Sequence, residues 1–534
     1  MKHISKILTG ACLSSLLWVN TGCIEETFPT SGATQDQLGA SAQATEALMW
    51  AMPAFFNNWA TIGSSYHYDW GYGSIMHIRD VMTEDMAVVY SNSGYDWYES
   101  WETNKYQGQD YVYAQFNWNY YYQFIQMSNN LIGAVDETSA TEQQLGYLGA
   151  AFAFRALAYL DLAQMIEFLP NDGTNGVNEA GNDVTNLTVP IVRETTTQDE
   201  ARNNPRVSRE EMAAFILGDL DKAEQYIVNL ERSSRTLPDL SVVYGLKARY
   251  YMWLGEYASA QNYARQAINA ADVTPMTEDQ CLNTTSGFND LSCWMWGSQL
   301  RAEDNQVQTG IVNWTSWMSN EATYGYTAAE PHLMINKRTY DRISDTDFRK
   351  KLWKAPAGSA LEGQTPFIDA SWGASLEDYA SVKFRPNAGN TLDYLEGSAS
   401  AFPVMRVEEM YFIEAEAAAH QNAGEGRTLL EDFMRNYRDP QYTCTASDVV
   451  DEIVFQKRVE LWGEGLTFFD VKRLNMPVTR GYDGTNFHDM ARLNTTTRPA
   501  WMNICIVRNE KANNPALTGY ENPDPTDAYT PWTE

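Results

Sequence analysis

Seven small or aromatic residues between positions 248 and 267 constrain the fold of this chain more than any other feature of its sequence. They fall at the spacings at which two antiparallel helices touch, where small side chains let a pair of helices pack closely. Gly255 lies between the two runs and is placed to make the turn. The seven residues are Ala248, Tyr251, Gly255, Tyr257, Ala260, Ala264 and Ala267. The pattern predicts one tightly packed helical pair.

The same spacing is that of the tetratricopeptide repeat, which needs about three or more helical pairs to bury a core. We therefore expect further pairs in which the repeat pattern has degenerated. Ser208 and Glu211 form a capping-box pattern at the start of one of them. Helical periodicity places these segments at residues 143–168, 208–228, 404–423 and 446–474. The chain is therefore predicted to be mostly α-helical.

Two stretches lack this periodicity, from about 275 to 400 and from 475 to 534. Gly, Asn, Asp, Thr and Trp dominate the first of them. Such sequence is typical of loops that lie over a rigid scaffold, where binding residues concentrate. We expect a scaffold of tetratricopeptide-like helical pairs with a loop-rich lobe that binds a ligand.

The first 22 residues read as a secretory signal. Lys2 and Lys6 precede an uncharged apolar run, and Thr21-Gly22 offers a small-residue cleavage site before Cys23. A cysteine as first mature residue is how bacterial lipoproteins begin, so Cys23 is the predicted lipidation site. The alternative is an ordinary secreted protein with a cysteine there by chance. Two or more acyl chains would anchor the protein stably to a membrane, whereas one binds only marginally.

Residues 23–40 follow as a polar stretch rich in Thr, Ser, Gly and Gln, which predicts a flexible tether. Glu25 and Glu26 directly after the cysteine resemble the export signal of surface-displayed lipoproteins in some Gram-negative bacteria. The sequence thus predicts a lipid-anchored protein on the cell surface, in the outer membrane.

Charge and cysteine usage exclude several classes of partner and cofactor. Acidic residues outnumber basic ones, 69 to 38, for a formal net charge of −31 at pH 7. Phosphate binding needs Lys and Arg, so nucleic acid and anionic lipid headgroups are not expected as ligands. The cysteines outside the signal form no CxxC and the histidines no HExxH, so we expect neither a metal site nor a cofactor. Cys281 and Cys293 are either a disulfide or two buried thiols.

Motifs along most of the mature chain resemble the SusD/RagB family of surface nutrient-binding lipoproteins. The most specific is Arg406 with Glu409, Tyr411, Glu414 and Glu416, which is similar to the family's R-x-A-E-x-Y-L-x-x-A-E-A helix. Further matches are Trp118, Tyr122, Ile125 and Asn129 in an early helix, Tyr340, Asp341, Asp347 and Arg349 in the middle, Arg458, Glu460, Glu464, Asp470 and Arg473 in a later helix, and Ile506, Glu510, Asn514 and Pro515 near the end.

This resemblance implies both a fold and a function. Residues 41–534 would form one SusD-like domain, with residues 41–275 and 404–474 as helical scaffold and residues 276–403 and 475–534 as the loop-rich lobe. The family's members sit as lids on a TonB-dependent outer-membrane channel of the SusC type. The resemblance therefore implies a binder that captures oligo- or polysaccharide and delivers it to such a channel.

Carboxylates in the carboxy-terminal motifs raise the question of catalysis, because paired carboxylates are what glycosidases use. Glu414, Glu416, Glu460, Glu464 and Asp470 lie within predicted helices, where ion pairs with nearby arginines are the simpler interpretation. The sequence contains no GxSxG, HExxH or phosphate-binding loop. We expect that the protein is not an enzyme.

Aromatic residues carry the prediction of a binding site. Residues 66–122 contain 17 Trp, Tyr or Phe, a density well above the 13% of the whole chain. Trp and Tyr stack on the flat C–H face of a sugar ring, while polar side chains bind its hydroxyls. We expect Tyr95, Trp97 and Trp101 on one side of the ligand and Trp294, Trp296 and Tyr326 on the other, with Arg79 and Asn92 as polar partners.

Two other functions remain open from the sequence. Some relatives of the same family serve peptide importers, although Trp-rich loops favour a glycan. A tetratricopeptide scaffold that binds a protein tail is a different class again, and the lipid anchor disfavours it.

Overall fold

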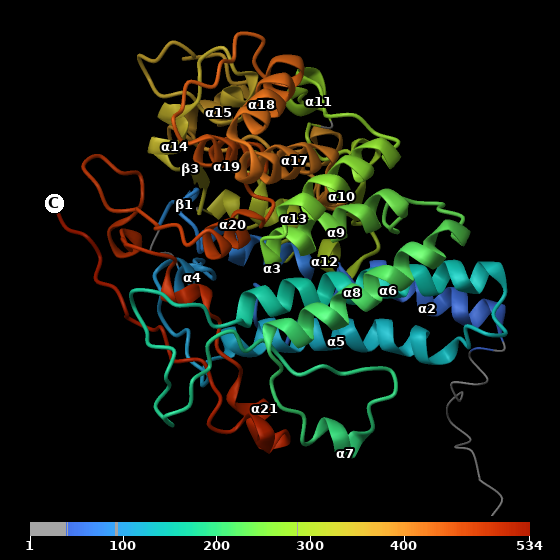
Figure 1. Cartoon of the computed structure of the whole chain (residues 1–534). Coiled ribbons are helices and arrows are strands. Elements are labelled where there is room, and N and C mark those ends of the chain that lie inside the picture. Colours follow the sequence, from blue (N-terminus) through green and yellow to red (C-terminus); the bar gives the residue numbers. More distant parts are fainter. Residues whose placement is uncertain (1–38, 40, 91–93, 286, 330) are drawn as a thin grey trace, which may run out of the picture.

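The computed structural model describes residues 39, 41–90, 94–285, 287–329 and 331–534. The predicted signal peptide, the lipidation site Cys23, nearly all of the tether and Asn92 lie outside the described residues. The described chain is mostly helical, as predicted, with two short antiparallel ribbons (Figure 1).

Helices form the scaffold; in Figure 1, α2, α5, α6 and α8 run side by side along the lower half of the molecule, and α17, α18 and α19 lie in the upper half. Neighbours in sequence pack as pairs: α5 with α6, α9 with α10, and α17 with α18, while α8 packs on α6 and α17 on α10. These helices are α2 (Ala42–Phe55), α5 (Val112–Ala134), α6 (Glu142–Ile166), α8 (Arg209–Tyr226), α9 (Leu240–Leu254), α10 (Tyr257–Ala270), α17 (Val407–Gln421), α18 (Ala423–Tyr437), α19 (Val449–Glu460) and α20 (Thr467–Arg473).

The predicted helical pair is confirmed in α9 and α10. Gly255 ends α9 in the left-handed conformation, at φ 73° and ψ 18°, which a glycine adopts without a steric penalty. Ala260, Ala264 and Ala267 are all 0% exposed and form the contact face of α10. Their small size allows α10 to pack between α9 and α17.

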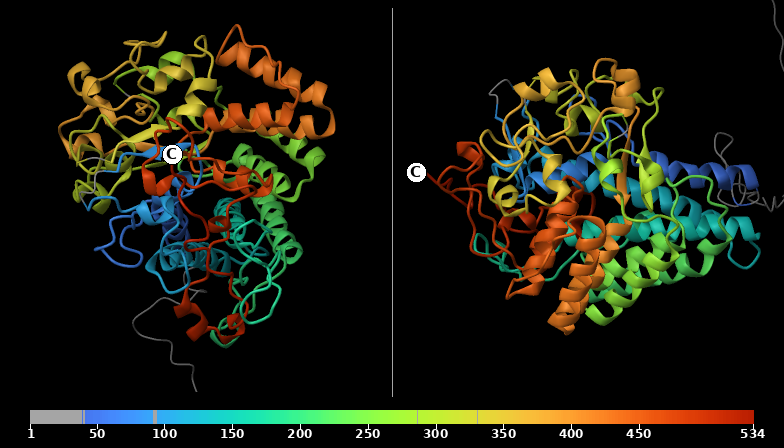
Figure 2. Two further views of the ribbon diagram at one scale, coloured as in Figure 1. Left: turned by 90° about the vertical axis from the view of Figure 1, so that its left-hand side faces the viewer. Right: turned by 90° about the horizontal axis from the view of Figure 1, so that it is seen from above.

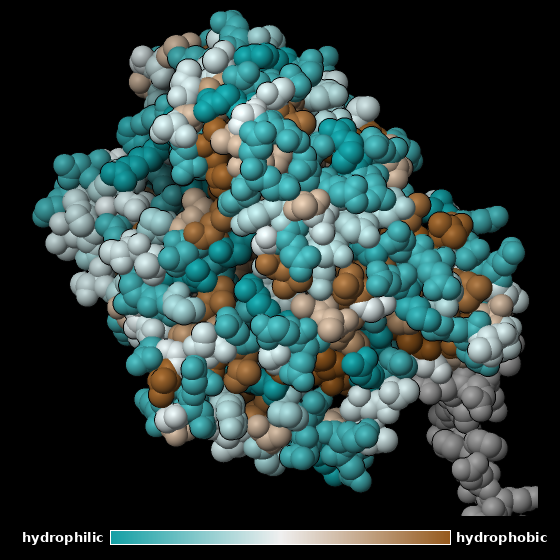
Figure 3. All heavy atoms as spheres, in the orientation of Figure 1, coloured by the Kyte–Doolittle hydropathy of each residue, from teal (hydrophilic) through white to brown (hydrophobic). Residues whose placement is uncertain are grey.

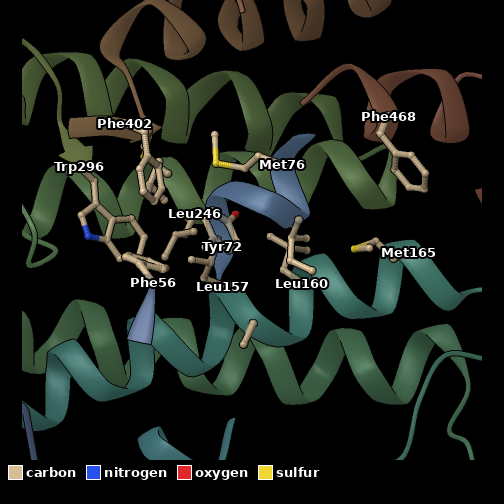
Figure 4. Close-up of a cluster of buried hydrophobic side chains, with 14 of the residues drawn as sticks. Phe56, Tyr72, Met76, Leu157, Leu160, Met165, Leu246, Trp296, Phe402 and Phe468 are labelled. Atoms are coloured by element: carbon tan, nitrogen blue, oxygen red, sulfur yellow. The ribbon is translucent and has the colours of Figure 1, made fainter. Parts of the chain in front are cut away.

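Helix α6 is the central core helix. It is apolar and long enough to cross a membrane, yet 94% of its most apolar window is buried inside the protein. Figure 4 shows Leu157, Leu160 and Met165 of α6 facing side chains from α9, α20 and the early segment around Tyr72. A Cβ atom on Gly149 of α6 would lie 2.5 Å from the backbone nitrogen of Ile227, so the residue after α8 approaches as closely as a glycine allows.

Two ribbons join segments that are far apart in sequence. Strand β1 (Met86–Val88) pairs antiparallel with β3 (Leu333–Ile335), and β2 (Trp296–Gln299) pairs antiparallel with β4 (Ala401–Met405). A helix had been expected to begin at Val404, but this residue lies in β4, and α17 begins at Val407. The apolar run Ala401–Met405 is buried throughout, and a short, fully buried apolar run suits a strand as well as a helix.

The remaining elements are short and lie mostly in the loop-rich parts. Seen from above in Figure 2, the long helices project to one side and the loop-rich segments gather at the other. The short helices are α3 (Tyr72–Val81), α4 (Glu99–Glu102), α7 (Gln198–Ala201), α11 (Glu278–Leu282), α12 (Asn305–Gln308), α13 (Trp314–Met318), α14 (Lys337–Arg342), α15 (Ala370–Ser375), α16 (Tyr394–Gly397) and α21 (Arg508–Asn513).

Cys281 and Cys293 were expected to form either a disulfide or two buried thiols, and the structure shows two thiols. Both are buried free thiols, as are Cys444 and Cys505. The amide of Gln280 donates a hydrogen bond to the Sγ of Cys293 at 3.4 Å.

Candidate functional site

The β1–β3 ribbon brings two distant loops together. In an antiparallel pair, the chain that leaves the end of one strand lies beside the chain that enters the other. The loop after β1 carries Tyr95 and Trp97, and the loop before β3 carries Tyr326. The backbone nitrogen of Val89 extends the ribbon by donating to the carbonyl of His332 at 3.0 Å. Rings from the two loops therefore meet at one end of the ribbon.

We call the resulting group the aromatic cluster; it consists of Tyr95, Trp97 and Tyr326 from these loops, together with His67 from the segment before α3. The rings of His67 and Trp97 stack with centroids 4.7 Å apart and planes 16° from parallel. Tyr326 meets His67 edge-on at 5.8 Å and Tyr95 edge-on at 5.9 Å. Tyr95 is 48% exposed, His67 and Trp97 are partly buried, and Tyr326 is 5% exposed.

A hydrogen bond joins two members of the cluster. The Tyr326 hydroxyl bonds to Nδ1 of His67. Burial lowers the pKa of His67, so its ring is neutral at pH 7.

Local contacts support the segment that carries His67 and the loop before β3. The carboxylate of Asp69 accepts hydrogen bonds from the backbone nitrogens of Ile62 and Gly63, at 2.6 and 3.3 Å. On the other side, the ring of Tyr326 stacks on Trp317 with centroids 4.0 Å apart and planes 9° from parallel. Gly325 lies beside Ser316 so closely that a Cβ atom would stand 2.3 Å from the Ser316 hydroxyl. A ligand would therefore meet rings that are already in place.

Three of the predicted stacking residues lie in this cluster. Tyr95 and Trp97 come from the early loop and Tyr326 from the middle lobe, and the structure brings them together across the ribbon. Their role in binding stays a prediction.

The structure corrects the expectation for the other predicted rings, which are core residues. Trp101 is 1% exposed and meets Tyr68 edge-on at 5.0 Å. Trp294 and Trp296 are 0% exposed, and Trp296 packs 5.5 Å from Phe56 (Figure 4). In the lobe, Gly- and Asn-rich sequence surrounds short buried elements such as β2. Aromatic residues in aperiodic sequence are therefore not necessarily exposed.

Arg79 is likewise no partner for a ligand in this structure. Its side chain is 0% exposed, and its guanidinium pairs with Asp161 of α6 at 2.8 Å. It closes a buried network in which Asp161 also accepts from the hydroxyls of Tyr72 and Tyr121. Asn92 lies outside the described residues.

Sequence reasoning missed His67 as a member of the site. It lies within the alternating run of Tyr66, Tyr68, Trp70 and Tyr72, in which the tyrosines and tryptophans were the expected binding residues. Tyr68 and Trp70 are 1% exposed, and His67 is more exposed than either. The alternation could have indicated this, because neighbouring residues in an extended loop point to opposite sides, so burial of Tyr68 and Trp70 leaves His67 on the other side.

The carboxylates of the carboxy-terminal motifs form structural ion pairs. Arg406, 0% exposed at its side chain, pairs with Glu408 at 2.9 Å, Glu460 at 3.1 Å and Glu464 at 2.9 Å. Arg473 contacts Asp470 at 2.7 Å and also pairs with Glu416. Glu414 instead pairs with Arg265 of α10. Carboxylates engaged in this way are placed to stabilise the scaffold.

Larger hollows exist elsewhere among the described residues. A groove of about 380 Å³ between α5 and α21 includes Trp118, which is only 4% exposed. The surface in Figure 3 is mostly hydrophilic, with apolar residues scattered among polar ones. The aromatic cluster is therefore distinguished by its chemistry and not by its volume.

Comparison with known proteins identifies the family. A family model described as "SusD family" matches residues 303–529, and one described as "Starch-binding associating with outer membrane" matches residues 64–252. No curated protein matches the chain.

Solved structures share the fold over nearly the whole chain. A SusD-like carbohydrate binding protein from Bacteroides vulgatus is 21% identical with a TM-score of 0.68, over 89% of this chain and 97% of that one. A SusD superfamily protein from Bacteroides thetaiotaomicron is 19% identical with a TM-score of 0.66, over 90% and 99%. Surface glycan-binding protein A from the same species, in complex with laminarihexaose, is 15% identical with a TM-score of 0.61, over 90% and 98%. With two models of one family matching its two halves, and with this fold, the chain belongs to the SusD family.

Proposed function

We propose that this protein is a cell-surface lipoprotein that binds an oligo- or polysaccharide at the aromatic cluster and delivers it to a TonB-dependent outer-membrane channel. The proposal rests mainly on the ring contacts among Tyr95, Trp97, His67 and Tyr326 at the end of the β1–β3 ribbon. Tyr95 is 48% exposed. The solved relative that holds laminarihexaose supports a glycan as the ligand class.

The chemistry of the cluster suits a sugar. Aromatic faces stack on the C–H face of a pyranose, and the rings pre-positioned by Trp317 and Asp69 lose little entropy when they bind. The imidazole of His67 and the hydroxyl of Tyr95 would supply hydrogen bonds at the edge of such a ring. Binding and release need no covalent chemistry, and we propose no enzymatic activity for the site.

Affinity electrophoresis in gels that contain single polysaccharides tests the binding. We expect the soluble mature chain to be retarded by at least one of laminarin, pullulan and xylan. Tyr95→Ala should relieve this retardation, whereas Tyr520→Ala should not, because Tyr520 is similarly exposed at 43% but lies outside the cluster. Equal retardation of both variants would place the glycan elsewhere on the protein.

The anchor is tested through Cys23. We expect Cys23→Ala to move the protein out of the outer-membrane fraction while it stays folded. Detergent partitioning that does not change in this variant would contradict lipidation at Cys23.

The channel partner rests on family membership alone. We expect the native protein, extracted in mild detergent, to co-purify with an outer-membrane barrel. A protein that purifies alone under these conditions would contradict delivery to such a channel. Incubation with the bound polysaccharide should release no new reducing ends, and their release would contradict the non-enzymatic assignment.

A further inference from the structure

We infer that a second carbohydrate site lies along α5, where an amide-lined groove and a pair of exposed tyrosines bind an extended, uncharged sugar chain. The ligand class rests on the proposed function, but the site does not, because none of its residues belongs to the aromatic cluster. The lining of the groove, the bonds that hold its walls and the tyrosines at its end each support this site.

The groove between α5 and α21 is lined mainly by groups that bind hydroxyls. An amide side chain both donates and accepts hydrogen bonds, as a sugar hydroxyl does, and a carboxylate accepts them. The groove holds about 380 Å³, which lies in the range of binding sites for small ligands. Gln123 and Gln126 are exposed, so the groove is open to solvent. Its amides and its one carboxylate are Asn119, Gln123, Gln126, Asn204, Asn514 and Glu510.

Hydrogen bonds hold the walls of the groove in place. The hydroxyl of Tyr122 on α5 donates to the carbonyl of Pro190 at 2.8 Å. The amide of Asn514, directly after α21, donates to the carbonyl of Asn204 at 2.6 Å and accepts from its backbone nitrogen at 3.0 Å. The segment 190–204 is thus tied to both helices, and Figure 1 shows α21 and α7 below α5. A groove that is already formed lowers the entropic cost of binding.

The aromatic side chains within the groove are part of its wall. The rings of Trp118 and Tyr122 lie side by side on α5, with centroids 4.5 Å apart and planes 39° from parallel. Trp118 is only 4% exposed, so its face is not available to a sugar. Stacking rings for this site must therefore come from outside the groove.

Tyr106 and Tyr111 supply such rings. They are 51% and 39% exposed, with centroids 5.2 Å apart. Tyr106 has a φ of 58°, in the left-handed region that a bulky residue rarely adopts. Such a conformation persists only where the surrounding structure fixes it, and the amide of Asn104 donates to the carbonyl of Pro525 at 2.7 Å. The carboxy-terminal segment thus braces the loop that presents the two rings.

The tyrosine pair and the groove form one continuous surface. Tyr111 is the N-cap residue of α5, and Trp118 and Tyr122 follow seven and eleven residues later. At 3.6 residues per turn, both lie within about 20° of Tyr111 around the helix, and the rise from Tyr111 to Tyr122 is about 16 Å. The backbone nitrogen of Arg508, the first residue of α21, donates to the carbonyl of Gln109 at 2.9 Å. The wall of the groove therefore reaches the tyrosine loop, and the surface suits an extended chain of sugar units.

The test compares two variants that each lose two helical amides. Asn119→Ala with Gln123→Ala changes the groove, whereas Gln225→Ala with Asn262→Ala removes exposed amides of α8 and α10 outside it. Alanine favours a helix, so both variants should fold, and circular dichroism verifies this. Affinity gels contain laminarin, pullulan or xylan.

A second pair of variants tests the exposed rings. Tyr111→Ala removes a ring at the end of the groove, and Tyr394→Ala on α16 is its control, because Tyr394 is 38% exposed against 39% for Tyr111. Tyr111→Ala should weaken the retardation and Tyr394→Ala should not.

We expect the groove variant to lose at least about tenfold in apparent affinity for the polysaccharide that retards the wild-type chain, relative to the α8–α10 variant. The physical reason is avidity, because two sites that hold one polymer strengthen each other. Equal retardation of the groove variant and the α8–α10 variant would overturn the inference.

Trp97→Ala separates a failure of the inference from a failure of the proposed function. Retardation that is lost in Trp97→Ala and unchanged in the groove variant would overturn the inference and leave binding at the aromatic cluster standing. Retardation that is lost in the groove variant and unchanged in Trp97→Ala would support the inference and contradict binding at the cluster.

Two further outcomes would also overturn the inference. Unchanged retardation of the groove variant, together with loss of the co-purifying barrel, would assign the groove to a protein partner. No retardation of the wild-type chain by any of the three polysaccharides would contradict both the proposed function and the second site.

Discussion

The charged residues around the carboxy-terminal helices and the rings of the aromatic cluster differ in how far they are buried. Around the helices, the charged groups are buried and paired. Arg406 and Arg438 at the ends of α17 and α18, with Arg349 and Lys383 of the middle lobe, face Asp347, Glu408, Glu460 and Glu464, and each side chain is at most 3% exposed. In the cluster, Tyr95 is 48% exposed and His67 and Trp97 are partly buried, while Tyr326 is 5% exposed.

The difference separates residues that hold the scaffold from residues that face a ligand. A charge is buried at a high desolvation cost and stays only where opposite charges and hydrogen bonds compensate it. A large ring that stays partly in water is available for contact with another molecule. In this protein, the charged motifs therefore belong to the buried scaffold, and the loops rich in aromatic residues form the candidate site.

Arg406→Ala should give the largest effect and act on the scaffold alone. It leaves the four buried carboxylates with three cations, and breaking a buried ion pair costs about 3–5 kcal/mol in the free energy of unfolding. Urea denaturation measures the loss. Arg435→Ala is the control, because Arg435 pairs with Glu431 while 43% exposed, and an exposed pair contributes about 0–1 kcal/mol. Equal losses in the two variants would break the comparison.

Trp97→Ala should mainly lower glycan affinity, whereas Trp101→Ala, in the same short segment, should mainly lower stability. Loss of the stacking ring Trp97 should lower glycan affinity by about 1–3 kcal/mol, which is tenfold or more. Loss of Trp101, which is 1% exposed, should lower the free energy of unfolding by about 3–5 kcal/mol. Affinity gels and urea denaturation of both variants test this. A larger loss of stability in Trp97→Ala than in Trp101→Ala would make Trp97 a core residue.

Gly255→Ala tests the turn of the α9–α10 pair and should have a smaller effect. At φ 73° an alanine Cβ is strained by about 1–2 kcal/mol, although nothing lies within 4 Å of it. Gly255→Asn should cost less, because asparagine tolerates the left-handed region. Urea denaturation of both variants gives the order, and glycan affinity should stay unchanged. An asparagine variant less stable than the alanine variant would contradict a backbone origin of the cost.

The pair of His488 and Glu102 should give the smallest effect, and it depends on pH. The carboxylate raises the pKa of His488 above its ordinary 6.5 in the folded state. The protonated imidazole therefore stabilises the fold fully below pH 6.5, and this contribution is lost as pH rises through the raised pKa. Relative to His488→Gln, the wild-type protein should be more stable at pH 6 than at pH 8.5 in urea denaturation. A difference of the opposite sign would show that the pair does not form.

The helical architecture could be predicted from local patterns because helices bury faces of regular period. The spacing of Ala260, Ala264 and Ala267 specified a close helix contact, and Ser208 specified the start of α8 through the capping box that the structure contains. The interpretation of the motif carboxylates as ion pairs also needed only their position within predicted helices. Cys23 and its lipidation remain a prediction from sequence alone.

Which aromatic residues face solvent was decided only by the tertiary structure. Trp97 and Trp101 lie in the same short segment, yet Trp101 packs beneath Tyr68 while Trp97 stacks on His67. Tyr326 joins the cluster through the pairing of β1 with β3, whose register connects positions about 250 residues apart. Local sequence sets the period and the ends of a helix, but exposure depends on which distant segment covers a side chain, and that information lies in the packing of the whole chain.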